Sequence, residues 1–368
     1  MKIVEFIDFH INHFKKYKEK WNYEDGCVLK GALDLYHSTG EKKYLDFVQR
    51  YLTETITEDG KIAVYEMEEF NIDNINSGKV LFDFYEITKE EKYRKAIEVL
   101  YQQLENHPRT QEGSFWHKKI YPNQVWLDGL YMAMPFYAKY EKLFNASKGF
   151  GDIYQQFMTV ERRIKDAETG LYYHGYDESR KERWSNPDTG LSLHFWGRAM
   201  GWFVMALVDT LEIIEADFSN AEEIKKIFVE TIDALLKYQD KASSMWYQVV
   251  DQGTREGNYL ETSGTLMIAY GILKGVRLGY LPENYRTFGQ KAFDGTVEKY
   301  LDTENQQLKG ICGVAGLGNV PYRDGSYEYY ISEAITPNDY KGLGAFLMAY
   351  SETLAYNKDN DNSADVSK

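Results

Sequence analysis

A pattern that occurs twice near the start of the chain constrains the fold more than any other feature of the sequence. One copy begins at Lys30 (KGALDLYHSTGEKKYLDFVQRYL) and the other at Gly78 (GKVLFDFYEITKEEKYRKAIEVLYQQL). Each copy has an apolar helical segment, a short polar turn and an amphipathic helical segment, which predicts an αα-hairpin that is repeated along the chain. The matched positions are Tyr36, Thr39 and Tyr44 in the first copy and Tyr85, Thr88 and Tyr93 in the second.

The rest of the chain continues this alternation. Four more helices open with glycine, at Gly129, Gly201, Gly264 and Gly342, and they are apolar nearly all round, as buried helices are. Six buried and six surface helices in alternation predict an all-α fold, an (α/α)6 barrel with an inner and an outer ring. The inner helices are then parallel, and their N-termini meet at one rim. The amphipathic segments rich in Lys and Glu are 3–20, 41–55, 90–105, 150–166, 221–239 and 285–301.

Composition limits the number of domains and the classes of function. The formal net charge of −14 argues against binding to nucleic acid or to an anionic membrane surface. The helical pattern fills residues 1–356, which we interpret as one (α/α)6 domain. The polar residues 357–368 predict a disordered tail.

The cellular location is predicted from the kinds of segment that the sequence contains. No run of 18 apolar residues occurs, so no transmembrane helix is expected. The first residues, MKIVEFIDFHINHF, carry Glu5 and Asp8 among apolar positions, which predicts an amphipathic helix and not a signal peptide. Cys27 and Cys312 are distant in sequence and do not indicate a disulfide framework. These features predict a cytoplasmic protein.

Three features interrupt the helical pattern. Pro135 lies inside the third inner helix, where a proline removes a backbone hydrogen bond and predicts a kink. Residues 168–196 and 303–340 are long connections, and long connections on a compact helical body are usually lids or binding loops.

Polar and aromatic residues gather just before the inner helices, where the predicted rim brings them together. Arg198 offers a planar fork that suits a carboxylate, and a cation is disfavoured at a helix N-terminus for structural reasons alone. Asp73 and Asp128 can move protons, and tryptophan rings stack on sugar rings. The set therefore suits a sugar acid. Its members are Asp73, His117, Lys118, Trp126, Asp128, His174, Trp196, Arg198 and Trp202.

Asp128 precedes the apolar helix that opens at Gly129, and two interpretations of it remain open. Apolar neighbours raise the pKa of a carboxyl group, while a helix N-terminus lowers it. Either shift tunes the group, as proton donation to a substrate requires. The alternative is a helix N-cap. Trp202 is likewise either a ligand contact or a core residue.

Five motifs are similar to those of one known family. In order and spacing they resemble the unsaturated rhamnogalacturonyl hydrolases, glycoside hydrolase family 105, which are related to the unsaturated glucuronyl hydrolases of family 88. The resemblance covers nearly the whole chain and implies an (α/α)6 barrel. Ala199 and Met200 stand where the family has Gly-Asn, which leaves the identity of the sugar open. The motifs are DNINSGK (73–79), WLDGLYMAMPFYA (126–138), YYHGYDES (172–179), FWGRAMGW (195–202) and ETSGT (261–265).

The resemblance also implies an activity and residue roles. The family removes a 4,5-unsaturated uronic acid from the non-reducing end of small oligosaccharides that lyases generate, here unsaturated galacturonyl-rhamnose from the rhamnogalacturonan of pectin. The reaction is a hydration of the C4–C5 double bond and requires no metal and no organic cofactor. By resemblance the proton donor is Asp128 and the second essential aspartate is Asp73. The implied substrate contacts are His117, Lys118, Trp126, His174, Trp196, Arg198 and Trp202.

Three other functions fit parts of the sequence. A sugar 2-epimerase on the same kind of helical barrel would use paired histidines, for which His117, His174 and His194 are candidates. An ordinary inverting glycosidase would use Asp73 and Asp128 as its two carboxylates. A carbohydrate-binding protein without activity would use aromatic grooves, but it would give Asp128 no evident purpose.

Overall fold

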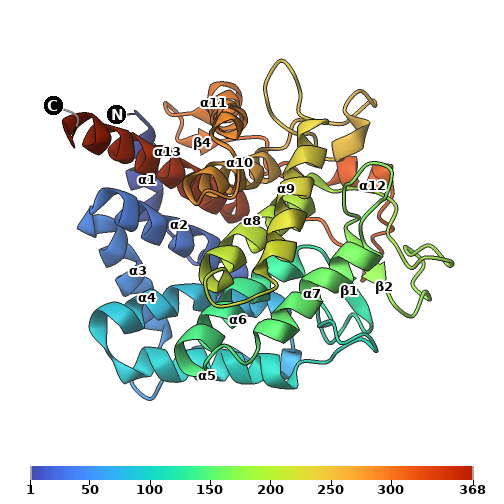
Figure 1. The fold of residues 1–368 in the computed structure, drawn as a ribbon, viewed down its shortest axis with the longest axis horizontal. Coiled ribbons are helices and arrows are strands. Elements are labelled where there is room, and N and C mark those ends of the chain that lie inside the picture. The colour runs from blue at the N-terminus through green and yellow to red at the C-terminus, as the bar shows by residue number, and fades with distance from the viewer. Residues whose placement is uncertain (1, 367–368) are drawn as a thin grey trace.

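Helices follow one another in the outer–inner alternation that the sequence predicts (Figure 1). The fold is that of a computed structural model, which describes residues 2–366 and the side chains of residues 2–355. The inner helices are α2 (Tyr23–Thr39), α4 (Lys79–Thr88), α6 (Gly129–Phe144), α8 (Gly197–Ile214), α10 (Thr262–Arg277) and α13 (Tyr340–Val366). The outer helices are α1 (Lys2–Asn12), α3 (Lys42–Thr55), α5 (Glu91–Asn106), α7 (Phe150–Arg163), α9 (Ala221–Leu236) and α11 (Arg286–Tyr300).

Short elements occupy the connections between these helices. They are the helix α12 (Tyr327–Ser332), the 3-10 helices η1 (Met67–Glu69), η2 (Ile72–Gly78), η3 (Val250–Gln252) and η4 (Glu283–Tyr285), and the strands β1 (Gln124–Trp126), β2 (Gly175–Asp177), β3 (Leu301–Asp302) and β4 (Gln307–Leu308). The strands form two antiparallel pairs, β1 with β2 and β3 with β4. Sheet structure therefore only ties loops together.

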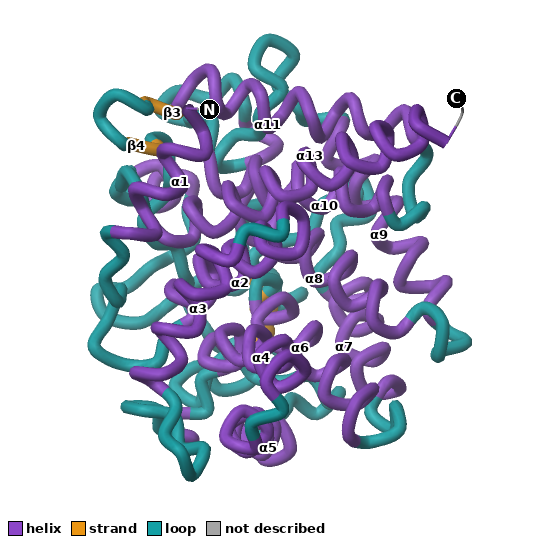
Figure 2. The backbone as a smooth tube through the Cα atoms, turned by 90° about the vertical axis from the view of Figure 1, so that its left-hand side faces the viewer, coloured by secondary structure: helices purple, strands orange, loops and turns teal. Residues whose placement is uncertain are grey.

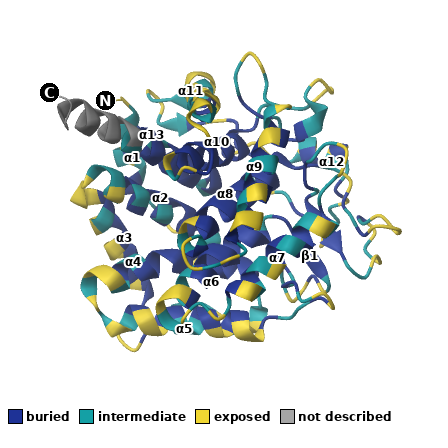
Figure 3. Cartoon of the chain, in the orientation of Figure 1, coloured by how far each residue is buried: buried dark blue, intermediate teal, exposed yellow. Residues whose placement is uncertain are grey.

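The inner helices close into a ring, which Figure 2 shows end-on with the outer helices around it. Each inner helix contacts the next, from α2 through α4, α6, α8 and α10 to α13, and α13 contacts α2. Figure 3 shows buried residues along α8 and α10 and exposed residues along α3 and α5. The predicted all-α (α/α)6 barrel is confirmed.

Glycines near the starts of the inner helices let their backbones approach closely. A Cβ atom added to Gly264 of α10 would lie 2.8 Å from the carbonyl oxygen of Gly197 on α8. A Cβ atom added to Gly344 of α13 would lie 2.5 Å from the carbonyl oxygen of Cys27 on α2. Gly264, one of the glycines that recur in the sequence, and Gly344 thus serve contacts between neighbouring inner helices.

The inner helices run in the same direction. A cavity of about 530 Å³ lies toward their C-terminal ends, and all six contribute side chains to it. One lining residue from each helix, in chain order, is Asp34, Asp83, Lys139, Glu212, Lys274 and Glu352. The N-termini of the same helices therefore meet at the opposite rim, as the sequence predicts.

Pro135 lies in the middle of α6, and its neighbours explain its presence. A proline has no N–H, so the carbonyl of Tyr131, four residues earlier, loses its helical donor. Lys79 Nζ donates to that carbonyl at 2.7 Å and to Asn76 Oδ1 at 2.8 Å. Helix α6 continues unbroken from Gly129 to Phe144. The proline thus provides an acceptor for a buried lysine.

The first outer helix is shorter than predicted. The pattern predicts a helical segment over residues 3–20, but α1 ends at Asn12. Beyond it, the backbone N–H of Tyr17 donates to Asp25 Oδ1 at 2.8 Å, and so takes no part in a helix. Lys16 and Lys20, four residues apart, would repel each other on one helical face. Both features disfavour a helix through residues 16–20.

Other predictions concern the tail and the location. The tail predicted over residues 357–368 lies outside the residues whose side chains are described, so it stays a prediction, as does the domain boundary. Within residues 2–366, no helix is both long and apolar enough to cross a membrane. Cys27 and Cys312 are separate, buried free thiols.

Candidate functional site

Short backbone pairings bring the predicted site residues together at the rim. The antiparallel pair of β1 and β2 places Trp126 opposite Gly175. The next backbone N–H, that of Leu127, donates to the carbonyl of His174 at 2.9 Å. Asp128 therefore lies beside His174, although a helix pair separates the two in sequence.

Asp73 lies in η2 and forms an ion pair. A β-bridge between Asn71 and Lys118 brings the two loops together. Lys118 Nζ lies 2.7 Å from Asp73 Oδ2, and His117 Nε2 lies 3.4 Å from Asp73 Oδ1. Burial raises the pKa of Asp73, but the positive charge of Lys118, with a smaller effect from His117, outweighs burial and holds this pKa below its usual value. Asp73 is therefore an anion at neutral pH.

Asp128 lies at the N-cap position of α6, but its side chain forms no capping hydrogen bond with the described residues. Its Oδ1 atom is buried and has no hydrogen-bond partner in residues 2–355. Burial, followed by the negative charge of Asp73, raises the pKa of Asp128 to about 7. The N-cap interpretation of this side chain is therefore wrong, and desolvation outweighs the helix N-terminus.

His174 is fully buried, and its two ring nitrogens have different surroundings. Nδ1 lies 2.7 Å from the hydroxyl of Tyr330. Nε2 lies 3.9 Å from Asp128 Oδ1 and has no hydrogen-bond partner among the described residues. Burial lowers the pKa of His174 well below its usual value, and a positive charge on the neighbouring His117 would lower it further. The ring is therefore neutral.

Arg198 is the second residue of α8, and its guanidinium is buried. Nη1 donates to the carbonyl of Cys312 and to Ser263 Oγ, the latter at 3.3 Å. The guanidinium lies 4.7 Å from the centre of the Trp196 ring. Nε has no hydrogen-bond partner in the described part of the chain. Nε–H is therefore a buried donor that no described protein group pairs.

The three predicted tryptophans pack against protein side chains. Trp126 stacks on His117 with ring centroids 4.3 Å apart, and the Trp196 ring lies 4.6 Å from that of His174. These two tryptophans therefore hold the two histidines in place. Trp202 instead stacks on Tyr131 at 4.9 Å, one turn deeper in the barrel. A sugar contact by any of the three stays a prediction.

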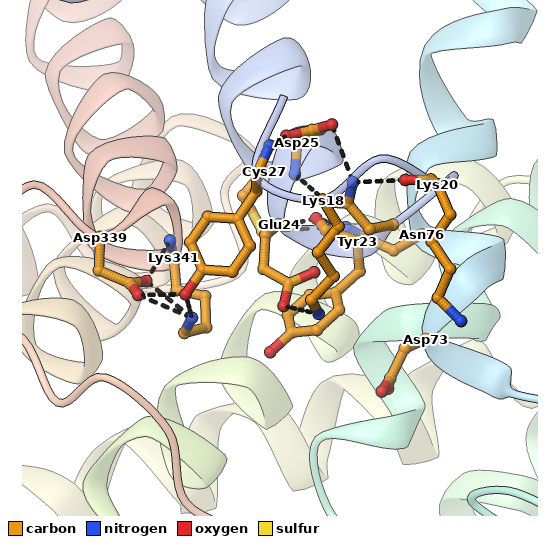
Figure 4. A network of polar contacts seen from close by, with 12 residues as sticks. Lys18, Lys20, Tyr23, Glu24, Asp25, Cys27, Asp73, Asn76, Asp339 and Lys341 are labelled. Carbon is orange, nitrogen blue, oxygen red and sulfur yellow. Dashed lines mark hydrogen bonds and ion pairs between the residues drawn. The ribbon is translucent and has the colours of Figure 1, made fainter. Parts of the chain in front are cut away.

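The starts of α2 and α13 form the neighbouring wall of the rim, with Asp73 beside it in Figure 4. Asp339 Oδ2 accepts hydrogen bonds from the hydroxyl of Tyr17 at 2.9 Å and from Lys341 Nζ at 3.0 Å. Burial raises the pKa of Tyr23 well above its usual value, and nearby acidic groups that include Asp73 raise it further. Tyr23 therefore presents a neutral phenol on this wall.

Asp73, His117 and Asp128 are also a group that can hold a metal. One donor atom from each lies within 4.8 Å of the others. The ammonium of Lys118 already supplies a positive charge to the Asp73 carboxylate of this group. The sequence predicts chemistry without a metal here, and that stays a prediction.

Residues that the sequence did not single out complete the cluster. Gln248 accepts a hydrogen bond from Trp196 Nε1 at 3.1 Å and donates to the backbone carbonyl of Tyr330 at 3.1 Å. Tyr330 lies on α12, within the long connection 303–340. The length of that connection indicates a functional segment, but no motif or periodicity marks the tyrosine itself.

Comparison with known proteins gives the family. The sequence profile of Glycosyl Hydrolase Family 88 matches residues 3–357. This chain belongs to that family. The chain is therefore a glycoside hydrolase of the group that includes the unsaturated uronyl hydrolases, and the family resemblance of its motifs is confirmed.

Individual relatives of this family 88 chain agree with the assignment. A solved structure of a family 105 glycoside hydrolase from C. acetobutylicum ATCC 824 is 50% identical, with a TM-score of 0.92 over 96% of this chain and 99% of that one. Unsaturated rhamnogalacturonyl hydrolase YesR of Bacillus subtilis is 25% identical over 334 residues, 88% of this chain and 90% of its own. An unsaturated glucuronyl hydrolase from Bacillus sp. GL1 is 13% identical and shares the fold, with a TM-score of 0.69 over 95% of this chain and 94% of that one.

Proposed function

We propose that this glycoside hydrolase removes a 4,5-unsaturated uronic acid from the non-reducing end of an oligosaccharide by hydrating its C4–C5 double bond. The observation that carries the proposal is that the pKa values of two neighbouring aspartates are shifted in opposite directions. The pKa of Asp128 is raised to about 7, and the pKa of Asp73 is lowered. Environments that push two pKa values apart create an acid and an anion side by side.

Asp128 acts as the general acid in this mechanism. Its carboxyl group protonates C4 of the enol ether, and positive charge develops at C5 and the ring oxygen. The Asp73 anion stabilises that charge. Water then adds at C5 and gives its proton to one of the two carboxylates. The resulting hemiketal opens and expels the glycosidic oxygen, so the anomeric carbon is never attacked, and carboxylate spacing does not decide the stereochemistry as it does in ordinary glycosidases.

Arg198 binds the carboxylate of the substrate in this proposal. The free Nε side of its guanidinium suits a planar acid group, and charge-assisted pairs of this kind are strong. The remaining proposed contacts are His117, Lys118, Trp126, His174, Trp196 and Trp202.

We propose unsaturated galacturonyl-rhamnose, from the rhamnogalacturonan of pectin, as the substrate. The motifs support this choice, as does the similarity to a protein named unsaturated rhamnogalacturonyl hydrolase. Ala199 and Met200 stand where the family 105 motif has Gly-Asn, and both are fully buried. Met200 Sδ accepts a hydrogen bond from the backbone N–H of Tyr172 at 3.3 Å. The departure therefore concerns packing behind the site. We also propose a cytoplasmic location, supported by the two free thiols.

The ultraviolet absorbance of the conjugated enol tests the reaction. With oligosaccharides from a rhamnogalacturonan lyase, the protein should abolish this absorbance, and Asp128→Asn should leave it nearly intact. An epimerase and a binding protein leave the absorbance unchanged, so persistence with every unsaturated uronide would overturn the proposal. An ordinary glycosidase also removes the absorbance in the end, because the free unsaturated uronic acid opens and ketonises, and it is distinguished by the position of the solvent oxygen in the product. Parallel assays with oligosaccharides that derive from glucuronic acid decide which uronic acid is preferred.

A further inference from the structure

Tyr330 and His174 form a buried contact that the proposed reaction does not use. The tyrosine hydroxyl lies 2.7 Å from His174 Nδ1, and the two residues are 156 positions apart in sequence. Both side chains have an exposed fraction of 0%. A phenol from a connecting segment thus reaches the far side of the histidine that faces Asp128.

The direction of this hydrogen bond follows from how many hydrogens the imidazole and the phenol hydroxyl carry. A neutral imidazole carries hydrogen on one nitrogen only. If Nδ1 donated to Tyr330, the buried hydroxyl hydrogen would need another acceptor, and Nε2 would face Asp128 with a bare lone pair. If Tyr330 donates, its hydrogen is paired and the ring hydrogen lies on Nε2. An unpaired buried donor is costly, so we assign Tyr330 as the donor.

The Nε2–H group of His174 then points at the acid. Nε2 lies 3.9 Å from Asp128 Oδ1, and both atoms are buried without another hydrogen-bond partner among the described residues. This separation exceeds a hydrogen bond by about 1 Å. Catalytic hydrogen bonds are often long before substrate binds and shorten afterwards. A small shift of the carboxylate or the ring completes the contact.

Gln248 fixes the arrangement from behind. Its side chain donates to the backbone carbonyl of Tyr330 at 3.1 Å and accepts from Trp196 Nε1 at 3.1 Å. Trp196 in turn packs against His174 with ring centroids 4.6 Å apart. The tyrosine and the imidazole are therefore held by one connected set of side chains.

We propose that Tyr330 is a positioning residue that fixes the Nε2–H tautomer of His174, so that the imidazole donates to Asp128 and cannot accept its proton. This inference rests on the proposed hydration reaction. In the other tautomer, protonated Asp128 would donate to the Nε2 lone pair and would be a poorer acid toward C4. With Nε2–H in place, the Asp128 proton goes to C4, and the carboxylate left behind accepts a hydrogen bond. No proton moves to His174 or Tyr330.

Nitrogen spectroscopy of the full chain tests the tautomer directly. In protein labelled with ¹⁵N-histidine and free of substrate, His174 should show a non-protonated Nδ1 and a protonated Nε2, with His174→Gln identifying the signals. Tyr330→Phe removes only the hydroxyl and should shift the population toward Nδ1–H. Tyr327→Phe is the matched control, because Tyr327 lies on the same helix and its hydroxyl donates to the carbonyl of Glu256 at 2.9 Å. Its spectrum should be unchanged.

Kinetics then separate positioning from a merely structural role. Tyr330→Phe should lower turnover about threefold to tenfold, the worth of one neutral hydrogen bond, with a Michaelis constant within twofold. Tyr327→Phe should leave both within twofold. A protonated Nδ1 in the unchanged protein, or a Tyr330→Phe protein with unchanged turnover, would overturn the inference. Because the spectrum is recorded without substrate, it decides the tautomer even if the hydration reaction fails its own assay or Tyr330→Phe fails to fold.

Discussion

The ammonium of Lys118 lies 2.7 Å from Oδ2 of Asp73, and this ion pair separates the protonation states of two neighbouring aspartates. Lys118 lowers the pKa of Asp73 against the effect of burial, and the Asp73 anion helps to raise the pKa of Asp128. In Lys118→Met we expect the pKa of Asp73 to rise. Because Asp73 acts as an anion, the acid limb of turnover against pH should move upward by at least about one pH unit.

Lys119→Met is the matched control for this experiment. Lys119 lies next in sequence, but its Nζ lies 3.5 Å from the carbonyl oxygen of Glu68 and 5.6 Å from the centre of the Phe70 ring. Its pH profile should overlay that of the unchanged enzyme. Identical acid limbs in the two variants would contradict the role assigned to Lys118.

The raised pKa of Asp128 also predicts a pH-dependent effect on stability. Its folded-state value of about 7 exceeds the usual 3.8, so the folded chain binds this proton more tightly than the unfolded chain does. The resulting stability is present at low pH and is lost as the pH rises from about 4 through 7. Asp128→Asn should therefore raise the melting temperature more at pH 8 than at pH 5. Scanning calorimetry at the two values measures this, and an equal change at both would mean that Asp128 titrates normally.

Arg198→Lys keeps the charge but removes the fork. A lysine can satisfy the carbonyl of Cys312, to which Arg198 Nη1 now donates, but it cannot also offer a second donor in the same plane. A charge-assisted pair is worth roughly 1.5–3 kcal/mol, so the Michaelis constant should rise about tenfold or more, with a smaller fall in turnover. Steady-state kinetics on protein with an unchanged circular dichroism spectrum measure both. An unchanged Michaelis constant would refute the carboxylate-binding role.

The carbonyl of Tyr131 should couple Pro135 to Lys79. Lys79→Met removes the donor to this carbonyl, and Pro135→Ala supplies a helical N–H in its place. Pro135→Ala should therefore stabilise the Lys79→Met protein more than it stabilises the unchanged protein, by about 1 kcal/mol. Denaturant unfolding of the two single variants and the double variant measures the difference. Additive changes would show that the two residues act independently.

The order of helices could be predicted because a buried inner helix is apolar on every side and an outer helix on one side only. The ends of helices depend on individual capping contacts, which leave no periodic pattern in the sequence. Helix α2 starts at Tyr23, seven residues before the apolar run at Lys30, because Asn22 Oδ1 accepts the backbone N–H of Asp25 at 2.8 Å and so caps it there. The helix propensity of the residues in the apolar run does not indicate that cap.

The candidate site could be predicted only where a residue is unusual for its own segment. Asp128 and Arg198 stand out because charged groups adjoin apolar helices, although their roles stay predictions. The partners that tune them come from loops. Lys118 reaches Asp73 through the β-bridge at Asn71, and Tyr330 reaches His174 across 156 residues. Pairing of this kind depends on the closed barrel and not on local sequence.

Asp128→Asn tests the proton donor and the route of the reaction together. The side chain caps no described backbone group, so the fold should survive its replacement by an amide of the same shape. General acid catalysis typically contributes about 10²–10⁴-fold, so turnover should fall by at least the lower factor while substrate binding stays near normal. The variant should therefore hold intact substrate in the site.

Isotope labels from the solvent show where its hydrogen and oxygen atoms enter the products of the unchanged enzyme. In deuterated water that carries heavy oxygen, hydration should place deuterium at C4 and the heavy oxygen at C5, and the oxygen of the leaving sugar should stay unlabelled. Mass spectrometry of the two products measures each position. Heavy oxygen on the leaving sugar, or at C1 in product trapped before its aldehyde exchanges with water, would rule out hydration. Full turnover in Asp128→Asn would instead mean that another residue is the general acid. Asp73 is the next candidate, because it is the second carboxylate in the cluster with His117 and Asp128.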